Sequence, residues 1–499
     1  MVRGRRIVPL LLAVTALGPA AAARATPGAT VLWGAYGGDA QLTNHVTAVK
    51  LTPATAPTLG VRWRQKVDTT VLASPLLATG VVIGGTSRTV LYAATEAGSV
   101  YAIDAATGLV LWKRTFGTVE AGSNCGTMGI SSTGAIDGPR GLLYVIGADG
   151  ALRALDLATG ASPAGWPLQI VQRTQTEYVW GGLRIVGERL LVPVASYCDQ
   201  PDGQGPAEGG IVAVDLATQT VAGRFDTVPG PTNLGGVWGW AGTSVEPDES
   251  FVYTAVGNSV VHDDACDCLV DDAGFGDSVV RLTPALEPVE FDRPPEIPSV
   301  HDYDFGAAPV LFQPEGCEPL AAANNKNGLM YVWRRHALAA GHIFADGIGT
   351  TSGAPFLGQP SWSPDRRLLL DAGARVIRDG KVVGDGVNAY TIGADCTFAP
   401  VWQTVTGSGT QPPPLIVGDV VFALGGSDTH FSVLDLASGK RLWIYDTGTA
   451  TQTPAIAAGD TIYTADADGV IRAFAPGATK QKPMPVKSRA HETWWVRTG

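Results

Sequence analysis

Residues suited to redox or cation chemistry follow one another in the middle of the chain. In chain order they are Trp238, Asn258, the acidic pair Asp302 and Asp304, and Lys326. A Trp face can stack on a flat polar cofactor, Asn and carboxylate oxygens can hold a hard cation, and a Lys ammonium can polarise a carbonyl. Their order therefore predicts a site that binds a cofactor and a cation.

Each of these residues also has a purely structural explanation. Trp238 can be one more packing aromatic among 13 Trp, Asp302 and Asp304 can cap a turn, and Lys326 sits in an Asn-Asn-Lys-Asn-Gly run typical of a hairpin. The seven histidines show no metalloenzyme spacing, and His301 is interpreted as a supporting residue beside the acidic pair. Neither a nucleophile elbow nor a phosphate loop occurs, which argues against hydrolases and nucleotide-dependent enzymes.

The elements that must position these residues come from a repeated motif. An Ala/Val-x-Asp tripeptide, small residues and usually a Gly precede an apolar stretch ending in Trp or Phe; this motif occurs at Asp104, Asp156, Asp215 and Asp435. Around Asp104 the order is strand, Gly turn, strand, Thr-Gly turn, strand, which is typical of a β-meander. Asp and Thr side chains can hydrogen-bond nearby backbone in such a turn. A self-similar unit of this length predicts a repeat fold.

Degenerate copies bring the number of repeats to eight. Their anchors are Asp104, Asp156, Asp215, Thr283, Arg334, Thr391, Asp435 and Ala475. They are roughly 40 to 68 residues apart, a period suited to propeller blades. We therefore predict an all-β fold, an eight-bladed β-propeller of four-stranded antiparallel blades, formed by residues 26–499 as a single domain. The last ~20 residues are expected to be a tail or a ring-closing strand. The longest interval, from Asp215 to Thr283, holds Trp238 and Asn258, so function is expected there.

The composition agrees with many short strands. The 499 residues include 63 Gly and 34 Pro, and charged residues make up 16% of the chain. The net charge of −11 argues against nucleic acid or an anionic membrane surface as a partner.

Residues 1–25 are interpreted as a secretory signal peptide. Arg3, Arg5 and Arg6 precede an apolar run over 7–17, and small residues follow. The apolar run is too short to span a bilayer. We therefore expect an exported protein, secreted or periplasmic, with no membrane span.

Six cysteines are present: Cys125, Cys198, Cys266, Cys268, Cys317 and Cys396. An even number in an exported chain favours disulfides and leaves 15 pairings open. Cys266 and Cys268 also have a spacing that can be read as thiolate metal ligation, but their acidic neighbours favour disulfide bonding. Because no Cys-x-x-Cys-His occurs, no covalently attached c-type haem is expected.

These motifs resemble those of the pyrroloquinoline quinone-dependent alcohol dehydrogenases and the wider quinoprotein propeller family. The resemblance runs from residues 33–39 to residues 448–454. It implies that the quinone ring lies on Trp238, that Asn258 binds the cation, and that Lys326 contacts the reactive carbonyl region of the quinone.

The resemblance also implies roles for four further positions. Ser196 would contact the quinone and Asp199 the cation, although this chain has Asp where the family has Glu. The family's catalytic base is an Asp followed by an aromatic residue, and both Asp302 and Asp304 fit. The Phe-Gly that follows favours Asp304. If Asp302 is the base, Asp304 falls where lanthanide-using members place a further metal-binding Asp.

The implied activity is oxidation of an alcohol or related hydroxyl compound, small or polymeric, with pyrroloquinoline quinone and Ca²⁺ or a lanthanide. The Asp accepts the hydroxyl proton while hydride passes to the quinone, and electrons leave to an external acceptor. Two departures open the cofactor pocket: Cys125 stands alone where the alcohol dehydrogenases have adjacent cysteines, and residues 407–411 lack the substrate-side Trp. The alternative is a non-catalytic propeller that acts as a binding or assembly scaffold, because outer-membrane assembly propellers share the repeats.

Overall fold

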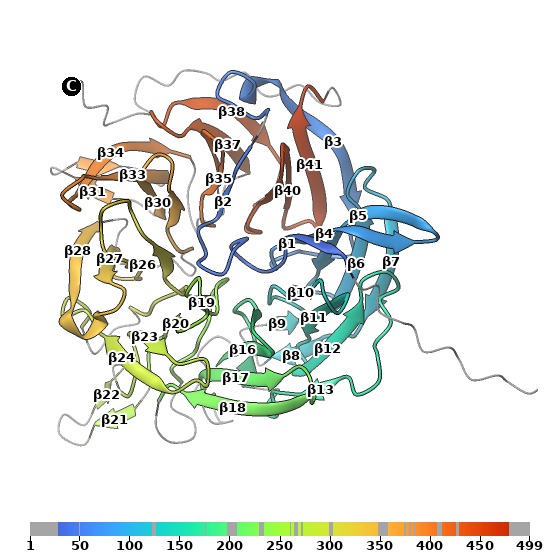
Figure 1. Ribbon diagram of the computed structural model, residues 1–499, viewed down its shortest axis with the longest axis horizontal. Coiled ribbons are helices and arrows are strands. Elements are labelled where there is room, and N and C mark those ends of the chain that lie inside the picture. The colour runs from blue at the N-terminus through green and yellow to red at the C-terminus, as the bar shows by residue number, and fades with distance from the viewer. Residues whose placement is uncertain are drawn as a thin grey trace, which may run out of the picture.

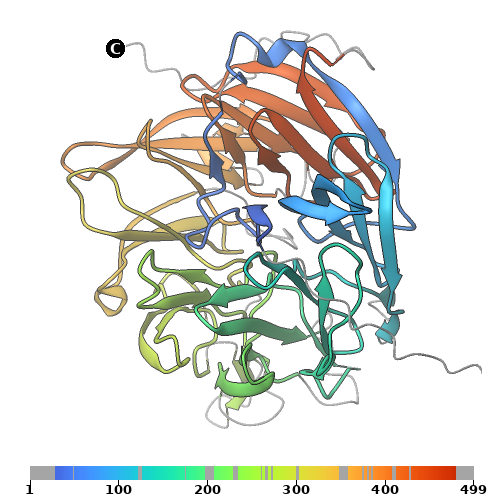
Figure 2. The ribbon, with the colours of Figure 1, turned by 45° about the vertical axis from the view of Figure 1, so that its right-hand side comes forward.

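Eight mainly antiparallel sheets stand around a common axis and form a closed ring (Figure 1). The computed structural model describes residues 28–478 except 49, 122–125, 175, 197–206, 229–233, 260, 264–267, 271–272, 299–302, 348–357, 374–375, 379–380, 384–385, 407–411 and 426–428. Figure 2 shows the same ring turned, with its twisted sheets side by side around the centre. The predicted eight-bladed β-propeller is confirmed. Within the described part of the chain, no helix is long and apolar enough to cross a membrane.

The first four blades follow one another along the chain, and in each of them the first strand lies nearest the axis. Blade 1 contains β1 (Thr30–Trp33), β4 (Leu76–Ile83), β5 (Thr86–Ala94), β6 (Ser99–Asp104) and β7 (Val110–Thr115). Blade 2 contains β10 (Ala135–Asp137), β11 (Leu142–Ile146), β12 (Ala151–Asp156) and β13 (Leu168–Gln169). Blade 3 contains β14 (Glu177–Tyr178) and β15 (Arg184–Val186), both paired with β16 (Arg189–Ser196), then β17 (Gly210–Asp215) and β18 (Thr220–Asp226). Blade 4 contains β19 (Ser244–Val245), β20 (Val252–Ala255), β23 (Val279–Leu282) and β24 (Pro288–Asp292).

The other four blades complete the ring. Blade 5 contains β25 (Val310–Phe312), β26 (Leu320–Asn324), β27 (Leu329–Arg334) and β28 (His342–Gly347). Blade 6 contains β29 (Ser361–Ser363), β30 (Leu368–Gly373), β33 (Gly386–Ile392) and β34 (Phe398–Val405). Blade 7 contains β2 (His45–Val46), β35 (Leu415–Val417), β36 (Val420–Leu424), β37 (His430–Asp435) and β38 (Arg441–Asp446). Blade 8 contains β39 (Ile456–Ala458), β40 (Thr461–Ala465), β41 (Val470–Pro476) and β3 (Leu59–Lys66).

The ring closes where an early strand joins the last blade. β3 pairs antiparallel with β41, so it supplies the fourth strand of blade 8. The last ~20 residues, expected to be a tail or a ring-closing strand, lie outside the described residues, as does the signal peptide over 1–25. When the added strands β1, β2 and β14 are left out of the count, all eight predicted anchors fall within one residue of the end of the third strand of a different blade. The spacing of the motif therefore measured the blades correctly.

The two ends of the ring carry different connections, because successive strands of a blade alternate in direction. First-to-second and third-to-fourth connections lie at one end, which we call the repeat face and which includes the turns 104–108, 156–160 and 435–439. Second-to-third connections and the links between blades lie at the other end, the insertion face. Three two-stranded hairpins interrupt connections of the insertion face: β8 (Val119–Ala121) with β9 (Gly126–Met128), β21 (Val261–Asp263) with β22 (Cys268–Val270), and β31 (Val376–Arg378) with β32 (Lys381–Val383). Two short 3-10 helices, η1 (Ala56–Thr58) and η2 (Leu338–Ala340), complete the described elements.

Side-chain hydrogen bonds build the turns of the repeat face. Oδ1 of Asp104 accepts hydrogen bonds from the N–H groups of Ala106 and Thr107 and from the Thr107 hydroxyl, each at 3.0 Å. Asp156 and Asp215 make the same three contacts in their own turns. The motif thus satisfies backbone donors that would otherwise lack partners at a tight turn.

The terminal Trp of a repeat docks on the next blade. Nε1 of Trp112 donates to the Leu157 carbonyl at 3.1 Å, and the Trp112 ring lies against Gly160, where an added Cβ would come within 2.8 Å of it. Trp402 of blade 6 repeats the contact on blade 7, donating to the Leu436 carbonyl at 3.0 Å. The turn formed by the repeated motif is therefore also the surface on which the Trp of the neighbouring blade packs.

Residues 34–46 lie at the centre of the ring, where the blue loop runs in Figure 1. Their carbonyls accept main-chain hydrogen bonds from the first strands or adjoining residues of five blades, donated by Ile136, Val245, Leu311, Trp362 and Ile416. Blade 3 contributes the Arg184 guanidinium, which donates to the carbonyls of Tyr36 and Asp39 at 2.7 and 3.1 Å. Burial lowers the pKa of Arg184 to about 10, so the guanidinium stays protonated at neutral pH. This axial segment and β1 together contact the first seven blades.

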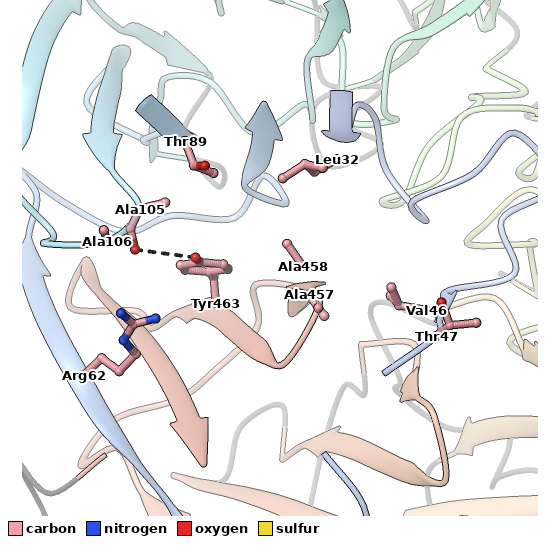
Figure 3. Close-up of a pocket in the computed structure, with 11 residues that line it drawn as sticks. Leu32, Val46, Thr47, Arg62, Thr89, Ala105, Ala106, Ala457, Ala458 and Tyr463 are labelled. Carbon is pink, nitrogen blue, oxygen red and sulfur yellow. Dashed lines mark hydrogen bonds between the residues drawn. The ribbon is translucent and has the colours of Figure 1, made fainter. Parts of the chain in front are cut away.

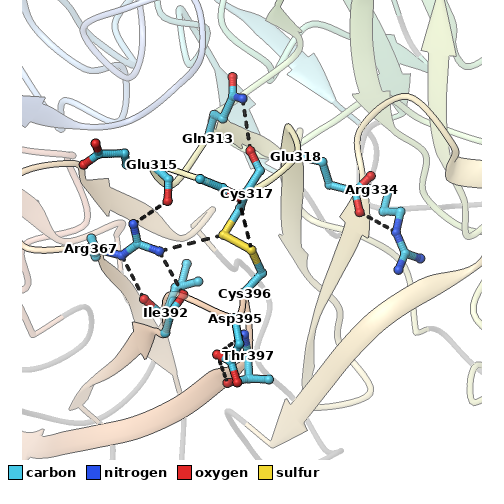
Figure 4. Close-up of a disulfide and its surroundings, with 12 residues drawn as sticks. Gln313, Glu315, Cys317, Glu318, Arg334, Arg367, Ile392, Asp395, Cys396 and Thr397 are labelled. Carbon is cyan, nitrogen blue, oxygen red and sulfur yellow. Dashed lines mark hydrogen bonds and ion pairs between the residues drawn. A yellow bond between two sulfur atoms is a disulfide. The ribbon is translucent and has the colours of Figure 1, made fainter.

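A disulfide joins blades 5 and 6 on the repeat face (Figure 4). Cys317 and Cys396 are 79 residues apart in sequence, and their Cα atoms are 5.8 Å apart. Arg367 lies beside the bridge and donates to the carbonyls of Glu315 and Ile392. The expectation of disulfides is confirmed for this pair. Cys125, Cys198 and Cys266 lie outside the described residues, and Cys268 is described only as part of β22.

Candidate active site

The predicted site residues come from two neighbouring blades and share one end of the ring. Trp238 and Asp304 precede the first strands of blades 4 and 5, whereas Asn258 and Lys326 follow the second strands of the same blades. Both kinds of connection belong to the insertion face. Chain direction alone therefore places all four residues on one face of the ring.

Asp304 and Lys326 form a buried ion pair. The Lys326 Nζ lies 2.5 Å from Asp304 Oδ1, and the two side chains are 14% and 4% exposed for Lys and Asp, respectively. Their backbones are also joined, because the Lys326 N–H donates to the Asp304 carbonyl at 3.1 Å and Phe305 forms an antiparallel bridge with Asn325. The ammonium thus stabilises a carboxylate that burial would otherwise penalise.

Trp238 completes a three-residue cluster with this pair. The Lys326 Nζ lies over the Trp238 ring, 4.7 Å from its centroid. Gly257 fits closely between Trp238 and Asp304. A Cβ built there would lie 3.0 Å from Trp238 Nε1 and 3.1 Å from Asp304 Oδ2. A side chain at residue 257 would therefore displace the aromatic ring or the carboxylate.

Asn258 and Ser196 are tied to the cluster through their backbones. The Gly235 N–H donates to the Asn258 carbonyl at 2.9 Å, and the Gly257 N–H donates to the Gly236 carbonyl at 2.9 Å, so the Gly-Asn step lies alongside the strand leading to Trp238. Ser196 ends β16, and its carbonyl accepts from the Trp180 indole at 2.9 Å. The residue before it, Ala195, packs closely on Gly236, because a Cβ built at Gly236 would lie 2.9 Å from the Ala195 Cβ.

Two predicted site residues and one supporting residue lie outside the described residues. They are Asp199, Asp302 and His301. The structure therefore brings together Trp238, Asp304 and Lys326 by side-chain contact and Asn258 by backbone contact. Which acidic residue serves as a base stays a prediction, although Asp304 is the one in contact with Lys326.

Lys326 occupies a hairpin turn as well as the cluster. The Asn325 side chain accepts from the Asn327 N–H at 2.9 Å, the Asn327 side chain accepts from the Leu329 N–H at 3.0 Å, and Gly328 has a φ of +87°. Asn327 also donates to the Tyr331 hydroxyl at 2.7 Å. The structural and functional explanations of this run therefore hold together, since the turn is what aims Lys326 at Asp304.

The chemistry of the cluster fits an aromatic quinone with a nearby cation. An aromatic face, an ammonium and a buried carboxylate meet beside Gly257, whose missing side chain lets the ring and the carboxylate approach its backbone. Carboxylate and amide oxygens of Asp304 and Asn258 are suitable ligands for a hard cation. Within the described ranges, no group of three or more His, Cys, Asp or Glu side chains is placed to hold a metal ion. The predicted cation ligands Asn258, Asp199 and Asp304 do not form such a group, because one of them is an Asn and Asp199 lies outside the described residues.

A cavity of about 560 Å³ lies on the opposite face of the ring (Figure 3). It is lined by turn residues of blades 1 and 8 together with β1 and β2, including Leu32, Ala105, Ala458 and Tyr463. Tyr463 reaches towards the Ala105 carbonyl across it. None of the predicted site residues lines this cavity, so it is separate from the cluster around Asp304.

An eight-bladed ring with an aromatic, an ammonium and a carboxylate converging on one face defines a quinoprotein-like propeller. The family described as "Glucose/ethanol/alcohol dehydrogenase, beta-propeller domain", which is a pyrroloquinoline quinone family, matches residues 33–337. This match covers more than half of the chain, and the chain belongs to that family. A second family, described as outer membrane protein assembly factor BamB, matches residues 347–487.

Similar proteins include dehydrogenases of two kinds. A quinohemoprotein alcohol dehydrogenase of Pseudomonas putida, ADH-IIG, is 26% identical over 41% of this chain and 30% of its own length. A polyvinylalcohol dehydrogenase of a Sphingopyxis species is 24% identical over 71% of this chain and 59% of its own length. The aligned region thus spans less than two thirds of the length of each relative. The solved structure of the P. putida ADHIIG superposes with a TM-score of 0.72 over 91% of this chain and 82% of that chain, at 16% identity, which shows the shared fold.

Proposed function

We propose that this protein is an exported quinoprotein oxidoreductase that oxidises an alcohol or related hydroxyl compound with bound pyrroloquinoline quinone and a cation. The contact of Lys326 with both Asp304 and the Trp238 face carries the proposal. Other ion pairs of the chain also lie over aromatic rings, such as Arg281 with Glu290 over Phe251, but the Asp304 carboxylate is more deeply buried, at 4% exposed against 15% for Glu290. Family membership supports the same conclusion.

The chain's own residues divide the work of the proposed site. Trp238 provides a flat surface, and Lys326 provides a positive charge beside it. Asp304 is proposed as the base, because its Oδ1 pairs with Lys326 while its Oδ2 lies beside Gly257, on the side of the Trp238 indole nitrogen. An ionised carboxylate in that position can take the proton of a substrate hydroxyl. Asp302 is the alternative base.

The remaining predicted residues belong to the cofactor and cation. Asn258, Asp199 and Asp304 are proposed to hold Ca²⁺ or a lanthanide, and Ser196 to contact the quinone. When bound, the quinone supplies the two-electron acceptor that the side chains of the protein do not provide. We propose that electrons pass from the quinone to an external acceptor, since no Cys-x-x-Cys-His motif occurs in these 499 residues.

Substrate and location follow the same reasoning. An alcohol is proposed as the substrate class, small or polymeric, because both kinds of dehydrogenase are among the similar proteins. Residues 1–25 are proposed to direct export, so the enzyme would work in the periplasm or outside the cell. No nucleic acid is proposed as a partner, given the net charge of −11.

Reconstitution of the purified full chain tests the proposal. The chain is incubated with pyrroloquinoline quinone and either Ca²⁺ or La³⁺, and both quinone co-elution and dye-linked oxidation of short alcohols and polyvinyl alcohol are measured. We expect saturable quinone binding, weakened about 10-fold or more in Trp238→Ala because a stacked ring contributes at least about 1.4 kcal/mol in a desolvated site. Trp166→Ala is the matched control, since Trp166 is equally half-buried but lies in blade 2, away from the cluster.

The outcomes separate the enzyme from the scaffold. An absence of quinone binding with both cations contradicts the proposal and favours the assembly role suggested by the match of residues 347–487. Equal weakening in Trp238→Ala and Trp166→Ala would trace the effect to folding instead of stacking.

A further inference from the structure

A row of fully buried polar side chains lies between blades 5 and 6. It consists of Asn324 in β26, Asp371 in β30, Asn388 in β33 and Gln403 in β34, each at most 1% exposed. The two blades are neighbours in the ring, as Figure 1 shows. Strands in a propeller core are expected to present apolar residues to the next blade, so four adjacent polar residues require an explanation.

Strand register places three of these residues on one face of blade 6. Asp371 lies directly opposite Asn388, and Asn388 lies directly opposite Gln403. Residues opposite each other in a sheet point to the same side, with Cβ atoms about 5 Å apart. Trp402 and Thr404, on either side of Gln403, hydrogen-bond to blade 7, so Gln403 and its partners point the other way, towards blade 5.

Asn324 of blade 5 completes the row from across the gap. Its Nδ2 donates to Asp371 Oδ1 and, at 2.8 Å, to the Gly358 carbonyl. Asn324 is also the last residue of β26, two positions before Lys326. The row is therefore close in sequence to the Lys326 turn but uses none of the proposed catalytic side chains.

Four amide atoms of the row lack hydrogen-bond partners. Asn324 Oδ1, Gln403 Oε1 and both side-chain polar atoms of Asn388 are buried without a hydrogen bond. Buried polar atoms nearly always have a partner, because an unsatisfied group has given up its hydrogen bonds to water without replacing them. The unmatched atoms are three oxygens and one NH₂, next to a carboxylate. An excess of oxygens over donors suits a hard cation, which binds carboxylate and amide oxygens.

We propose that this row is a structural Ca²⁺ site between blades 5 and 6, distinct from the cation of the proposed quinone site. Asp371 supplies the carboxylate, and Asn324, Asn388 and Gln403 supply amide oxygens. With one charged ligand among four, the site belongs with weak extracellular calcium sites, whose dissociation constants are about 10⁻⁴–10⁻³ M. The ion links the end of β26 to blade 6 and so steadies the turn that carries Lys326.

Calcium-dependent thermal stability of the quinone-free, chelator-treated full chain tests the site. We expect 10 mM Ca²⁺ to raise the Tm of the wild type by about 2 °C. Tb³⁺ should bind in its place and give luminescence sensitised by nearby aromatic rings. Asp371→Asn and Asn388→Leu should lose the Tm shift and weaken Tb³⁺ binding about 10-fold or more. Asn388→Leu should otherwise fold as well as the wild type, since it replaces an amide lacking partners by an apolar group of similar size.

Two controls keep the result specific. Asp137→Asn removes another buried carboxylate, in blade 2, and should keep the Ca²⁺ shift. Asp304→Asn should also keep it, because the proposal does not depend on the quinone site. A wild type with neither a Ca²⁺ shift nor Tb³⁺ luminescence overturns the proposal. So does a shift that survives in both row variants, or one that disappears only in Asp304→Asn, which would assign the ion to the quinone site.

Discussion

The repeat face and the insertion face are opposite ends of the same strands, yet they use sequence in different ways. On the repeat face, Asp104, Asp156 and Asp215 make the same three hydrogen bonds in blade after blade. On the insertion face, Asp304 lies in a link between blades and Lys326 in a hairpin turn, and their contact is not part of the repeated motif. Periodic residues thus hold the blades together, and the proposed chemistry lies at the other end, where periodicity is lost.

Asp304→Asn should have the largest effect, and it should impair the proposed chemistry of the insertion face. We expect dye-linked alcohol oxidation by the reconstituted enzyme to fall about 10³-fold, because the proposed base is lost. The variant should also be less stable, since Lys326 keeps a largely buried charge without its carboxylate. Activity per folded molecule and urea unfolding are measured together.

Asp466→Asn is the matched control for that variant. Asp466 and Arg472 form an equally buried ion pair at the corresponding turn of blade 8. Its loss should lower stability in the same way but leave the activity of the folded enzyme unchanged. Similar losses of activity in both variants would contradict a special role for Asp304.

Trp402→Ala should instead weaken the packing between blades on the repeat face. The substitution removes a buried ring and its hydrogen bond to Leu436, and we expect the free energy of unfolding to fall by about 4 kcal/mol. Trp402→Phe keeps most of the ring and should cost about 1 kcal/mol for the lost hydrogen bond. Urea denaturation followed by fluorescence measures both. If Trp402→Ala lowered turnover but left stability unchanged, the division into a stabilising repeat face and a catalytic insertion face would be wrong.

The Cys317→Ser/Cys396→Ser double variant tests the repeat face with a smaller effect. The bridge closes a loop of 79 residues, so its removal should lower the free energy of unfolding by about 3 kcal/mol. Quinone binding should not change, because the bridge lies on the repeat face, at the opposite end of blades 5 and 6 from the proposed site. Calorimetry and quinone titration of the same preparation decide the matter. Weaker quinone binding in this variant would mean that the faces are mechanically coupled.

Asp104→Asn should give the smallest effect, and one that depends on pH. Burial would raise the pKa of Asp104, but hydrogen bonds from Arg88 and Thr107 outweigh it and lower the pKa below its usual value. A depressed pKa stabilises the fold above the unfolded pKa near 4, and this contribution disappears as pH falls through the folded pKa. The wild type should therefore exceed the variant by less than about 1 kcal/mol at pH 7, with Arg88 partly exposed, and this difference should shrink below pH 4. Tm measured against pH checks this, and a gap that widens in acid would contradict it.

The fold was predictable because its determinants are local. The Asp104 turn is specified by residues two and three positions away, and the same sequence signal recurs in other blades. The cluster around Lys326 was predictable only through the family resemblance, since the chain between Asp304 and Lys326 contains a complete hairpin of blade 5.

Other features left no readable pattern in the sequence. Asp371 and Asn324 are 47 positions apart, and Asn388 reads as an ordinary strand residue until cross-strand register is known. The pairing of Cys317 with Cys396 was one of 15 alternatives for the same reason. The spacer role of Gly257 had a weak signal, a Gly just after a strand, but its two neighbours come from other segments. Contacts between blades depend on the whole ring, and a single sequence does not specify them locally.

The axial segment has a consequence for biosynthesis. Residues 34–46 leave the ribosome well before their partners Ile416 and Gly418 in blade 7. β3 likewise has no strand to pair with until β41 has been synthesised. Such contacts between distant parts of the chain make folding slow, because loop-closure entropy must be overcome before they form. In the nascent chain the axial segment and β3 therefore lack these partners until blades 7 and 8 have been synthesised, and the ring closes only after that.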